Sequence, residues 1–360
     1  MELKITKEEL TKTVNIASKG IANKNTMVIL DCFLITAQED EVRFTANSTE
    51  LGVEVFPEAE IIEDGSICVD SRMFSPIVSK LPDGDVTLKT DGENLIVKGG
   101  RAKFSLAIHD GSEFPAVDVV SRDTEIKLTQ EELKDAIRQT VFCASVADMN
   151  KLMTGCLMSV EGDKLKITAL DGHRIAIREL TLDKEYEPVK AVVPSKTLQE
   201  LVKSLSEGDI DIYVTDSLIS FSFGNCQFVS RLIQGDYFDV NRMLSFEFSS
   251  EVTVDRQELY DCMDRAILLV KEIDRKPVVF TIGDTLKADI ATQLGSLDEE
   301  IEIKKTGENL VIGLNPKFVL EALRAIDETK VSMYFINGHS PCYIKGEEYL
   351  YLILPVQVAV

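Results

Sequence analysis

The sequence is poor in the features that mark secreted, membrane-spanning or disulfide-bonded chains. Its seven cysteines stand singly and never at Cys-x-x-Cys spacing, so neither a disulfide framework nor a zinc site is expected. We expect buried thiols in a reducing cytoplasm. No apolar run approaches the roughly 20 residues that a membrane helix needs. The opening Met1-Glu2-Leu3-Lys4 has neither the basic nor the apolar segment of a signal peptide. We therefore expect a cytoplasmic protein without a membrane segment.

Catalytic and cofactor motifs are equally scarce. The only three histidines, His109, His173 and His339, lie in unrelated contexts, and no Gly-x-Ser-x-Gly motif accompanies them. A hydrolase acting through His173 is one alternative, but a structural or groove-lining histidine is favoured. The chain has no P-loop, no Gly-x-Gly-x-x-Gly segment and no calcium-loop spacing. We expect no cofactor, no metal and no enzymatic activity.

Positive charge is in deficit, with a net charge of −22 over 360 residues. Binding to phosphate groups requires cations, so this total argues against a nucleic-acid partner. The uneven distribution of the charge matters more than its sum.

The most informative feature is an internal repeat. The motif Glu2–Leu10 returns about 120 residues later as Glu125–Leu133, and Val252–Leu259 is a fainter third copy. A repeat of that length is able to bury its own core. We therefore expect three similar domains in tandem, at residues 1–121, 122–248 and 249–360. Such a chain presents a repeated surface more readily than a single catalytic pocket.

Each repeat has the pattern of an α+β unit. It opens with an alternating strand and a helix-capping residue, and it closes with short strands separated by polar turns. This pattern favours an antiparallel sheet with two helices on one face. The second helix of each repeat is expected to begin at Ser71, Ser195 or Asn315, all favoured N-caps. The six helices are expected at residues 6–20, 71–81, 129–143, 195–205, 255–272 and 315–326.

The expected helices hold slightly more cations than anions, although the whole chain is strongly acidic. Each second helix carries two cations about two turns apart, which places them on one face. A single such pair is typical of an ordinary solvated face. Its threefold recurrence on an acidic chain instead favours a mildly cationic wall. The pairs are Arg72 and Lys80, Lys196 and Lys203, and Lys317 and Arg324.

Several motifs resemble those of one known family. They include Ala-Leu-Asp-Gly-His-Arg-Ile-Ala at 169–176, Val-Pro-Ser-Lys at 193–196 and Gly-Leu-Asn-Pro at 313–316. The segment 232–238 and the ending Tyr-Leu-Tyr-Leu-Ile-Leu-Pro-Val at 349–356 belong to the same set. Together they make the whole chain resemble the bacterial replicative sliding clamp, the beta subunit of DNA polymerase III.

The resemblance implies a clamp fold that closes into a ring as a head-to-tail homodimer. Helices would line a central hole through which duplex DNA passes without sequence readout. The ring would be a processivity factor that tethers the replicative polymerase, the clamp loader and repair proteins through their short hydrophobic motifs. A peptide-binding scaffold without a DNA role is the alternative.

The resemblance also implies three sets of residues. The dimer interface comprises Phe104, Leu106, Leu268 and Leu269, with the first two on an edge strand and the last two on a helix. The DNA-facing set comprises Lys24, Arg72, Lys80, Lys151, Lys196, Lys203, Lys317 and Arg324. The partner-peptide cleft comprises Met153, Leu170, Gly172, His173, Arg174, Ile175, Phe238, Arg242, Met243, Asn315, Phe318, Pro341, Leu352, Ile353, Leu354, Pro355 and Val356, with His173, Arg174 and Asn315 at its rim.

Overall fold

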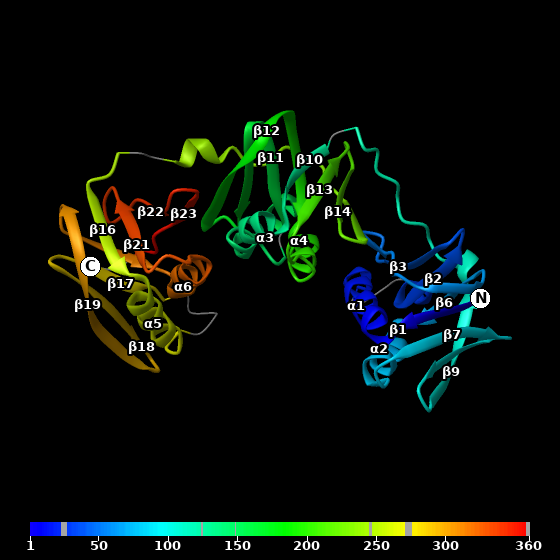
Figure 1. Ribbon diagram of the computed structural model, residues 1–360. Helices are drawn as coiled ribbons and strands as arrows, with labels where there is room; N and C mark the ends of the chain where they lie inside the picture. Colours follow the sequence, from blue (N-terminus) through cyan, green and yellow to red (C-terminus); the bar gives the residue numbers. More distant parts are fainter. Residues whose placement is uncertain (23–26, 124, 148, 245–246, 271–275, 358–360) are drawn as a thin grey trace. The chain divides into compact units, whose positions relative to one another are not determined.

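The computed structural model describes residues 1–22, 27–123, 125–147, 149–244, 247–270 and 276–357 (Figure 1). The chain divides into two compact units, each described here by itself. The first unit comprises Met1–Glu131 and Lys196–Leu232, and the second comprises Glu132–Ser195 and Ile233–Val360. The middle repeat of the sequence is therefore shared between the two units.

The first unit is built on one antiparallel sheet of thirteen strands among the described residues. Its helices are α1 (Lys7–Ala17), α2 (Ser71–Lys80) and, from its second residue on, α4 (Ser195–Val202). The sheet contains, in chain order, β1 (Glu2–Thr6), β2 (Cys32–Gln38), β3 (Glu41–Asn47), β4 (Leu51–Val55), β5 (Glu60–Glu63), β6 (Gly65–Asp70), β7 (Asp85–Asp91), β8 (Asn94–Gly99), β9 (Ala102–Asp110), β10 (Glu125–Thr129), β13 (Asp209–Val214), β14 (Leu218–Phe223) and β15 (Cys226–Arg231).

The second unit is built on an antiparallel sheet of ten strands within the described ranges. Its helices are α3 (Gln130–Arg138), from Glu132 on, α5 (Arg256–Ile267) and α6 (Pro316–Ala325). The sheet contains β11 (Gly155–Leu170), β12 (Arg174–Pro194), β16 (Ser250–Asp255), β17 (Val278–Ile282), β18 (Thr285–Thr292), β19 (Gly295–Gly307), β20 (Leu310–Leu314), β21 (Lys330–Phe335), β22 (Cys342–Lys345) and β23 (Tyr349–Ile353).

The starts of the helices follow from their capping residues. The Thr6 hydroxyl accepts a hydrogen bond from the Glu9 amide at 3.2 Å, and the Asp255 carboxylate does the same at the start of α5. Asn315 caps α6 as expected. The prediction for α2 was wrong by one residue, because the Asp70 carboxylate is the cap and Ser71 instead donates to the Asp31 carbonyl at 2.6 Å.

The helices end earlier than their apolar spacing predicts. The expected helix 129–143 stops at Arg138, and the segment Val141–Cys143 is a separate 3₁₀ turn. The expected helix 255–272 stops at Ile267, after which Leu268, Leu269 and Val270 each donate to the carbonyl three residues earlier. A 3₁₀ turn keeps apolar residues on nearly the same face, so the spacing alone does not mark where the α-helix ends.

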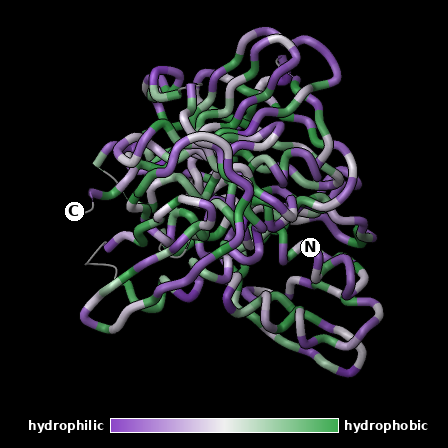
Figure 2. The backbone as a smooth tube through the Cα atoms, turned by 90° about the vertical axis from the view of Figure 1, so that its left-hand side faces the viewer, coloured by the Kyte–Doolittle hydropathy of each residue, from purple (hydrophilic) through white to green (hydrophobic). Residues whose placement is uncertain are grey.

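Alternation along the strands builds the core. Hydrophobic and hydrophilic residues follow one another along the hairpins (Figure 2), and alternate residues such as Val86, Leu88, Leu95 and Val97 are fully buried. All seven cysteines are free and buried, as expected, and burial raises the pKa of every thiol. Among the described residues, no helix is long and apolar enough to cross a membrane.

Two equivalent seams join successive repeats. In the first unit, β4 of the first repeat pairs with β15, the last strand of the middle repeat, and Val53 lies opposite Phe228. In the second unit, β12 of the middle repeat pairs with β23, the last strand of the chain, and Ala176 lies opposite Tyr351. Each seam thus joins the second strand of one repeat's hairpin to the final strand of the next repeat.

Candidate functional site

The Asp-Gly-His-Arg motif forms the tight turn between β11 and β12. One carboxylate oxygen of Asp171 accepts hydrogen bonds from the backbone amides of His173 and Arg174, at 3.0 and 3.1 Å. Gly172 has a φ of +82°, a conformation that side chains with a Cβ rarely adopt. The exposed His173 ring stacks against the Phe318 ring at a centroid distance of 6.2 Å. The motif therefore fixes a turn and brings His173 to α6.

Arg174 is buried, so its expected place at the rim of the cleft was wrong. Its Nε donates to Asp171 at 2.9 Å, one terminal nitrogen pairs with Glu321, and the other donates to the Phe142 carbonyl at 2.7 Å. Its guanidinium also lies 4.4 Å from the centre of the Phe318 ring. Burial lowers its pKa, but the neighbouring acidic groups outweigh that effect and raise it. Arg174 is a buried cation that ties β12 to α6.

An apolar cluster lies beneath this turn. It consists of buried Leu170, Ile175 and Leu352, all expected in the cleft, together with Ile177, Val240 and Tyr343, which sequence reasoning missed. Met153 and Phe238 pack against it as half-buried side chains. Leu352 lies on β23 opposite Ile175 across the seam, so the cluster draws on both repeats.

The tail after β23 is fixed by two backbone hydrogen bonds. The Leu354 amide donates to the His173 carbonyl at 2.9 Å, and the Val356 amide donates to the Gly313 carbonyl at 2.8 Å. The tail thereby runs from the Asp-Gly-His-Arg turn to β20. Leu354 and Met243 are 40% and 58% exposed, which is unusual for large apolar side chains. Both are available to contact a ligand.

The other cleft residues occupy distinct places. Ile353 is buried and pairs with Cys342, which follows the half-buried Pro341. Asn315 caps α6, one turn before Phe318, and Pro355 and Val356 are half-buried. Arg242 is exposed and forms an ion pair with Asp239 at 3.2 Å. The Tyr343 hydroxyl donates to the Met243 carbonyl at 3.0 Å and so holds the segment that carries Met243.

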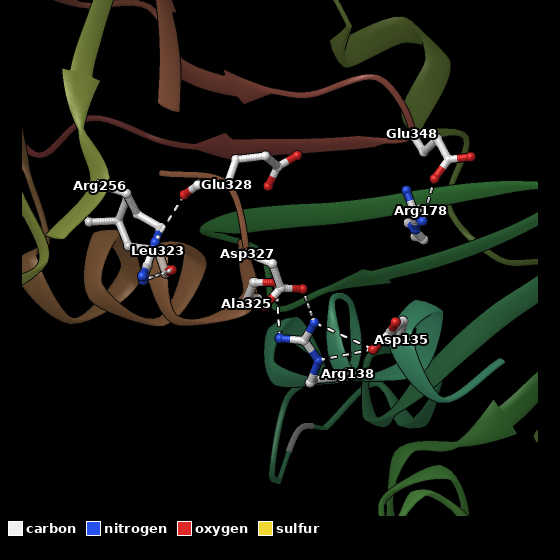
Figure 3. Close-up of polar contacts among 9 residues, drawn as sticks. All are labelled: Asp135, Arg138, Arg178, Arg256, Leu323, Ala325, Asp327, Glu328 and Glu348. Carbon is white, nitrogen blue, oxygen red and sulfur yellow. Dashed lines mark hydrogen bonds and ion pairs between the residues drawn. The ribbon is translucent and has the colours of Figure 1, made fainter. Parts of the chain in front are cut away.

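Polar contacts hold the surrounding elements together (Figure 3). Arg138 at the end of α3 donates to the Ala325 carbonyl at 3.2 Å and forms an ion pair with Asp327. Arg178 on β12 pairs with Glu348 at 2.5 Å. These contacts join residues more than a hundred positions apart, and no local pattern in the sequence could have indicated them.

The expected DNA-facing cations lie at the surface wherever they are described. The side chains of Arg72, Lys80, Lys151, Lys196, Lys203, Lys317 and Arg324 are exposed, and Lys24 lies outside the described residues. Some have local partners, since Arg72 pairs with Asp31 and Lys203 with Glu200. Arg324 donates to the Tyr260 hydroxyl at 3.2 Å. Ion pairs with neighbouring acids therefore offset part of the positive charge that these side chains carry.

The expected interface residues occupy two open surfaces. Among the described residues, the part of β9 that carries Phe104 and Leu106 pairs only with β8, so this stretch is an edge, as expected. Leu268 and Leu269 lie just past α5 and not within it, a correction that follows from the early end of that helix. Leu268 is 78% exposed. Within the described part of the chain, no group of acidic, histidine or cysteine side chains could hold a metal ion.

Comparisons with known proteins give matches to one family along the whole chain. Three family models match in succession, described as the N-terminal, central and C-terminal domains of the DNA polymerase III beta subunit, at residues 1–118, 127–239 and 241–357. The beta sliding clamps of Staphylococcus epidermidis and Staphylococcus aureus are 31% and 32% identical, each alignment covering 99% of both chains.

Solved structures show the same relationship. A putative DNA polymerase III beta subunit from Eubacterium rectale has a TM-score of 0.94 and 44% identity, covering 99% of both chains. The DNA polymerase sliding clamp from Bacillus subtilis has a TM-score of 0.95 and 30% identity, covering 100% of both. The tandem α+β repeats, their matching seams and these similarities show that the chain belongs to the DNA polymerase III beta subunit family, the beta sliding clamps.

Proposed function

We propose that the chain closes, as a head-to-tail dimer, into a ring around duplex DNA and acts there as a processivity factor. The ring holds the replicative polymerase, the clamp loader and repair proteins through their short hydrophobic motifs. It acts in the cytoplasm, has no catalytic role, and consists of domains at 1–121, 122–248 and 249–360. Family membership supports this proposal, and the pairing of the strands supports the closure of the ring.

The observation that carries ring closure is the open edge of two strands, β9 and β19. In the described residues, β9 has no partner besides β8 over residues 102–107. β19 has no partner besides β18 over residues 295–302. They are the last strand of the first repeat and the second hairpin strand of the third repeat, the same two kinds of strand that form the internal seams. Exposed edges of this length favour pairing with another chain.

The internal seams supply a register for this contact. The hairpin pairs Ala46–Val53, Ala169–Ala176 and Ile290–Leu297 have the same separation along the chain, so Leu297 corresponds to Val53 and Ala176. Phe104 lies four residues after the turn glycine Gly100, and Phe228 lies four residues after Gly224, both glycines with a positive φ. Phe104 therefore corresponds to Phe228. Transferring the seam register places Leu297 opposite the partner's Phe104.

The same register matches the charges and the apolar side chains. It places Asp298 opposite the partner's Lys103 and Glu300 opposite the partner's Arg101. It also places Gly295 opposite the partner's Leu106. A Cβ atom at Gly295 would lie 3.5 Å from the Leu269 side chain, so this leucine lies beside the proposed contact. Complementary charges flanking apolar contacts are typical of specific interfaces.

A charge exchange tests this register. Lys103→Glu and Asp298→Lys should each raise the dissociation constant of the dimer on the order of tenfold, and the double variant should recover much of the loss. Sedimentation equilibrium measures all three. Lys330→Glu makes the same change of charge at an exposed position on β21 and should leave the dimer intact. Equal losses in the single and double variants would exclude the proposed pairing.

Non-specific contact with DNA fits the exposed helix cations on an acidic chain. A few cations near the duplex suffice for phosphate contact without base readout, and the remaining negative charge opposes binding elsewhere. The ring should be retained on nicked circular DNA and should leave linear DNA by its ends. Neutralising Lys196 and Lys203 should make binding less dependent on salt. A scaffold without a DNA role would show no difference between circular and linear templates.

A further inference from the structure

The first seam has the same turn as the candidate cleft. Asn47 pairs with Gly52 across the turn between β3 and β4. Leu170 pairs with Ile175 in the same way across the Asp-Gly-His-Arg turn. The second residue of each turn has a positive φ, +69° at Thr49 and +82° in the Asp-Gly-His-Arg turn. The repeat therefore places one kind of turn at both seams.

The chain that leaves each seam is also held alike. The Arg231 amide donates to the Glu50 carbonyl at 3.0 Å, at the end of β15. The Leu354 amide donates to the His173 carbonyl at 2.9 Å, just after β23. Both bonds tie the residue after the seam to the turn, so Arg231 occupies the place that Leu354 has in the candidate cleft.

An apolar cluster lies at the first seam as well. Its members are the buried Val120, Tyr213 and Val229 and the half-buried Val117 and Leu218. Val229 lies opposite Gly52, as Leu352 lies opposite Ile175 at the second seam. The first unit therefore contains the backbone frame and part of the apolar floor of a groove like the candidate cleft.

This groove is occupied by residues 115–118 of the chain itself, a segment we call the strap. A Cβ atom at Gly52 would lie 2.6 Å from a methyl group of Val117, so the valine fills the space above this glycine. The hollow that remains has a volume of about 90 Å³. Ligand pockets typically have about 300–1,000 Å³. With the strap in place, the first seam is too small for a peptide.

Polar contacts hold the strap in the groove. The buried Asn47 side chain donates to the carbonyls of Pro115 and Ala116, both at 3.2 Å. Arg231 forms an ion pair with Asp118 at 3.2 Å. At the second seam, both of the positions that correspond to Asn47 and Arg231 hold leucine, which offers neither contact. The residues that fasten the strap are therefore specific to the first seam.

We infer that the strap is a built-in occupant of a second peptide groove. It closes the first seam to other proteins, so that each chain offers partners the groove at the second seam alone. The ligand of the vacated first groove is a short apolar peptide that resembles the strap, with a valine above Gly52. The consequence for partner binding rests on the proposed binding of hydrophobic motifs at the second seam.

The test uses the full-length chain and a labelled peptide, Phe-Pro-Ala-Val-Asp-Val-Val, the sequence of residues 114–120. The strap is removed by four substitutions together, Pro115→Gly, Ala116→Ser, Val117→Gly and Asp118→Ser. Fluorescence anisotropy should show about tenfold tighter binding than to the wild type, because a tethered competitor is gone. Adding Gly52→Val should cancel this gain, since its side chain fills the space of the peptide's valine. Val119→Ser is the control, because Val119 is 93% exposed, and it should change nothing.

Two results would overturn the inference. One is a strap-free variant that keeps its circular dichroism spectrum but binds the peptide no more tightly than the wild type does. The other is a gain that persists with Gly52→Val, since the peptide would then bind elsewhere. Val117→Ser alone should give a smaller gain, and it decides the question if the fourfold variant does not fold.

A second peptide separates this inference from the proposed cleft. A labelled apolar motif that binds at the second seam should bind the wild type and the strap-free variant at that site with equal affinity. If it binds neither chain, the proposed cleft fails. The gain of the strap peptide and its loss with Gly52→Val would still decide whether the first seam is a closed groove.

Discussion

Replacing Arg174 with methionine tests the buried ion pair that supports the candidate cleft. Methionine keeps much of the volume of the side chain but removes its charge and all its donors. The Asp171 and Glu321 carboxylates would lose their charged partner, and the Phe142 carbonyl would lose its donor. Asp171 would keep the hydrogen bonds from two backbone amides. The contact between the guanidinium and the Phe318 ring would also disappear.

The expected loss can be worked out from the burial of the groups left behind. Removing one partner of a fully buried ion pair costs about 3–5 kcal/mol. The Asp171 and Glu321 side chains retain 15% and 25% exposure, so water solvates them in part. We therefore expect the lower end, about 3 kcal/mol. Arg174→Lys should recover only part of this, because an ammonium lacks the planar fork that reaches three acceptors in different directions.

Urea unfolding followed by far-ultraviolet circular dichroism measures the loss, since the chain has no tryptophan for fluorescence. Hydrogen exchange should locate the destabilisation in the second unit. Arg72→Met is the matched control, because the Arg72 side chain is 70% exposed and its pair with Asp31 should contribute no more than about 1 kcal/mol. If Arg174→Met changed the stability no more than this control, the view of Arg174 as a structural tie would be wrong.

Three further outcomes are expected. Deleting the tail from Leu354 onward should abolish peptide binding measured by fluorescence anisotropy, whereas Met243→Ala should weaken it less, because a flexible thioether is one of several apolar contacts. Leu268→Ala combined with Leu269→Ala should yield folded single chains by sedimentation, since Leu268 is mostly exposed in the isolated chain. Asp289→Asn should raise the free energy of unfolding at pH 7 by about 0.2–1 kcal/mol, because burial and a cross-strand aspartate raise the pKa of Asp289. Because the pKa of Asp289 is raised in the folded state, the wild-type protein loses stability as the pH rises above about 4. The extra stability of the Asp289→Asn variant should therefore vanish in urea titrations at pH 4.

The starts of the helices could be predicted from the sequence because capping is a local interaction. Thr6, Asp255 and Asn315 each bond to amides two or three residues ahead, and this spacing is visible in the sequence. The ends could not be predicted, because the 3₁₀ turns after α3 and α5 continue the apolar spacing. The error mattered for Leu268, which leaves the helix and becomes exposed.

The candidate site shows the same division between local and distant effects. The sequence drew attention to Asp171, Gly172 and His173 as one motif, and they do form one turn. It could not show that Arg174 is buried, because the partner Glu321 lies 147 residues away. The sequence contains no signal for such a pairing, since the charge of one helix residue looks the same whether it faces water or a buried guanidinium.

By itself, the sequence determined that one α+β unit occurs three times, with buried thiols and with a pair of cations on or directly after each second helix, because repetition, alternation and capping are local properties of the chain. Only the tertiary structure decided which strands join the repeats, which edges stay open and which charges are buried. Those outcomes depend on backbone hydrogen bonds and desolvation between residues far apart in the chain. The open edges of β9 and β19 follow from the pairing of these two strands, and the proposed register of the ring follows from the two seams.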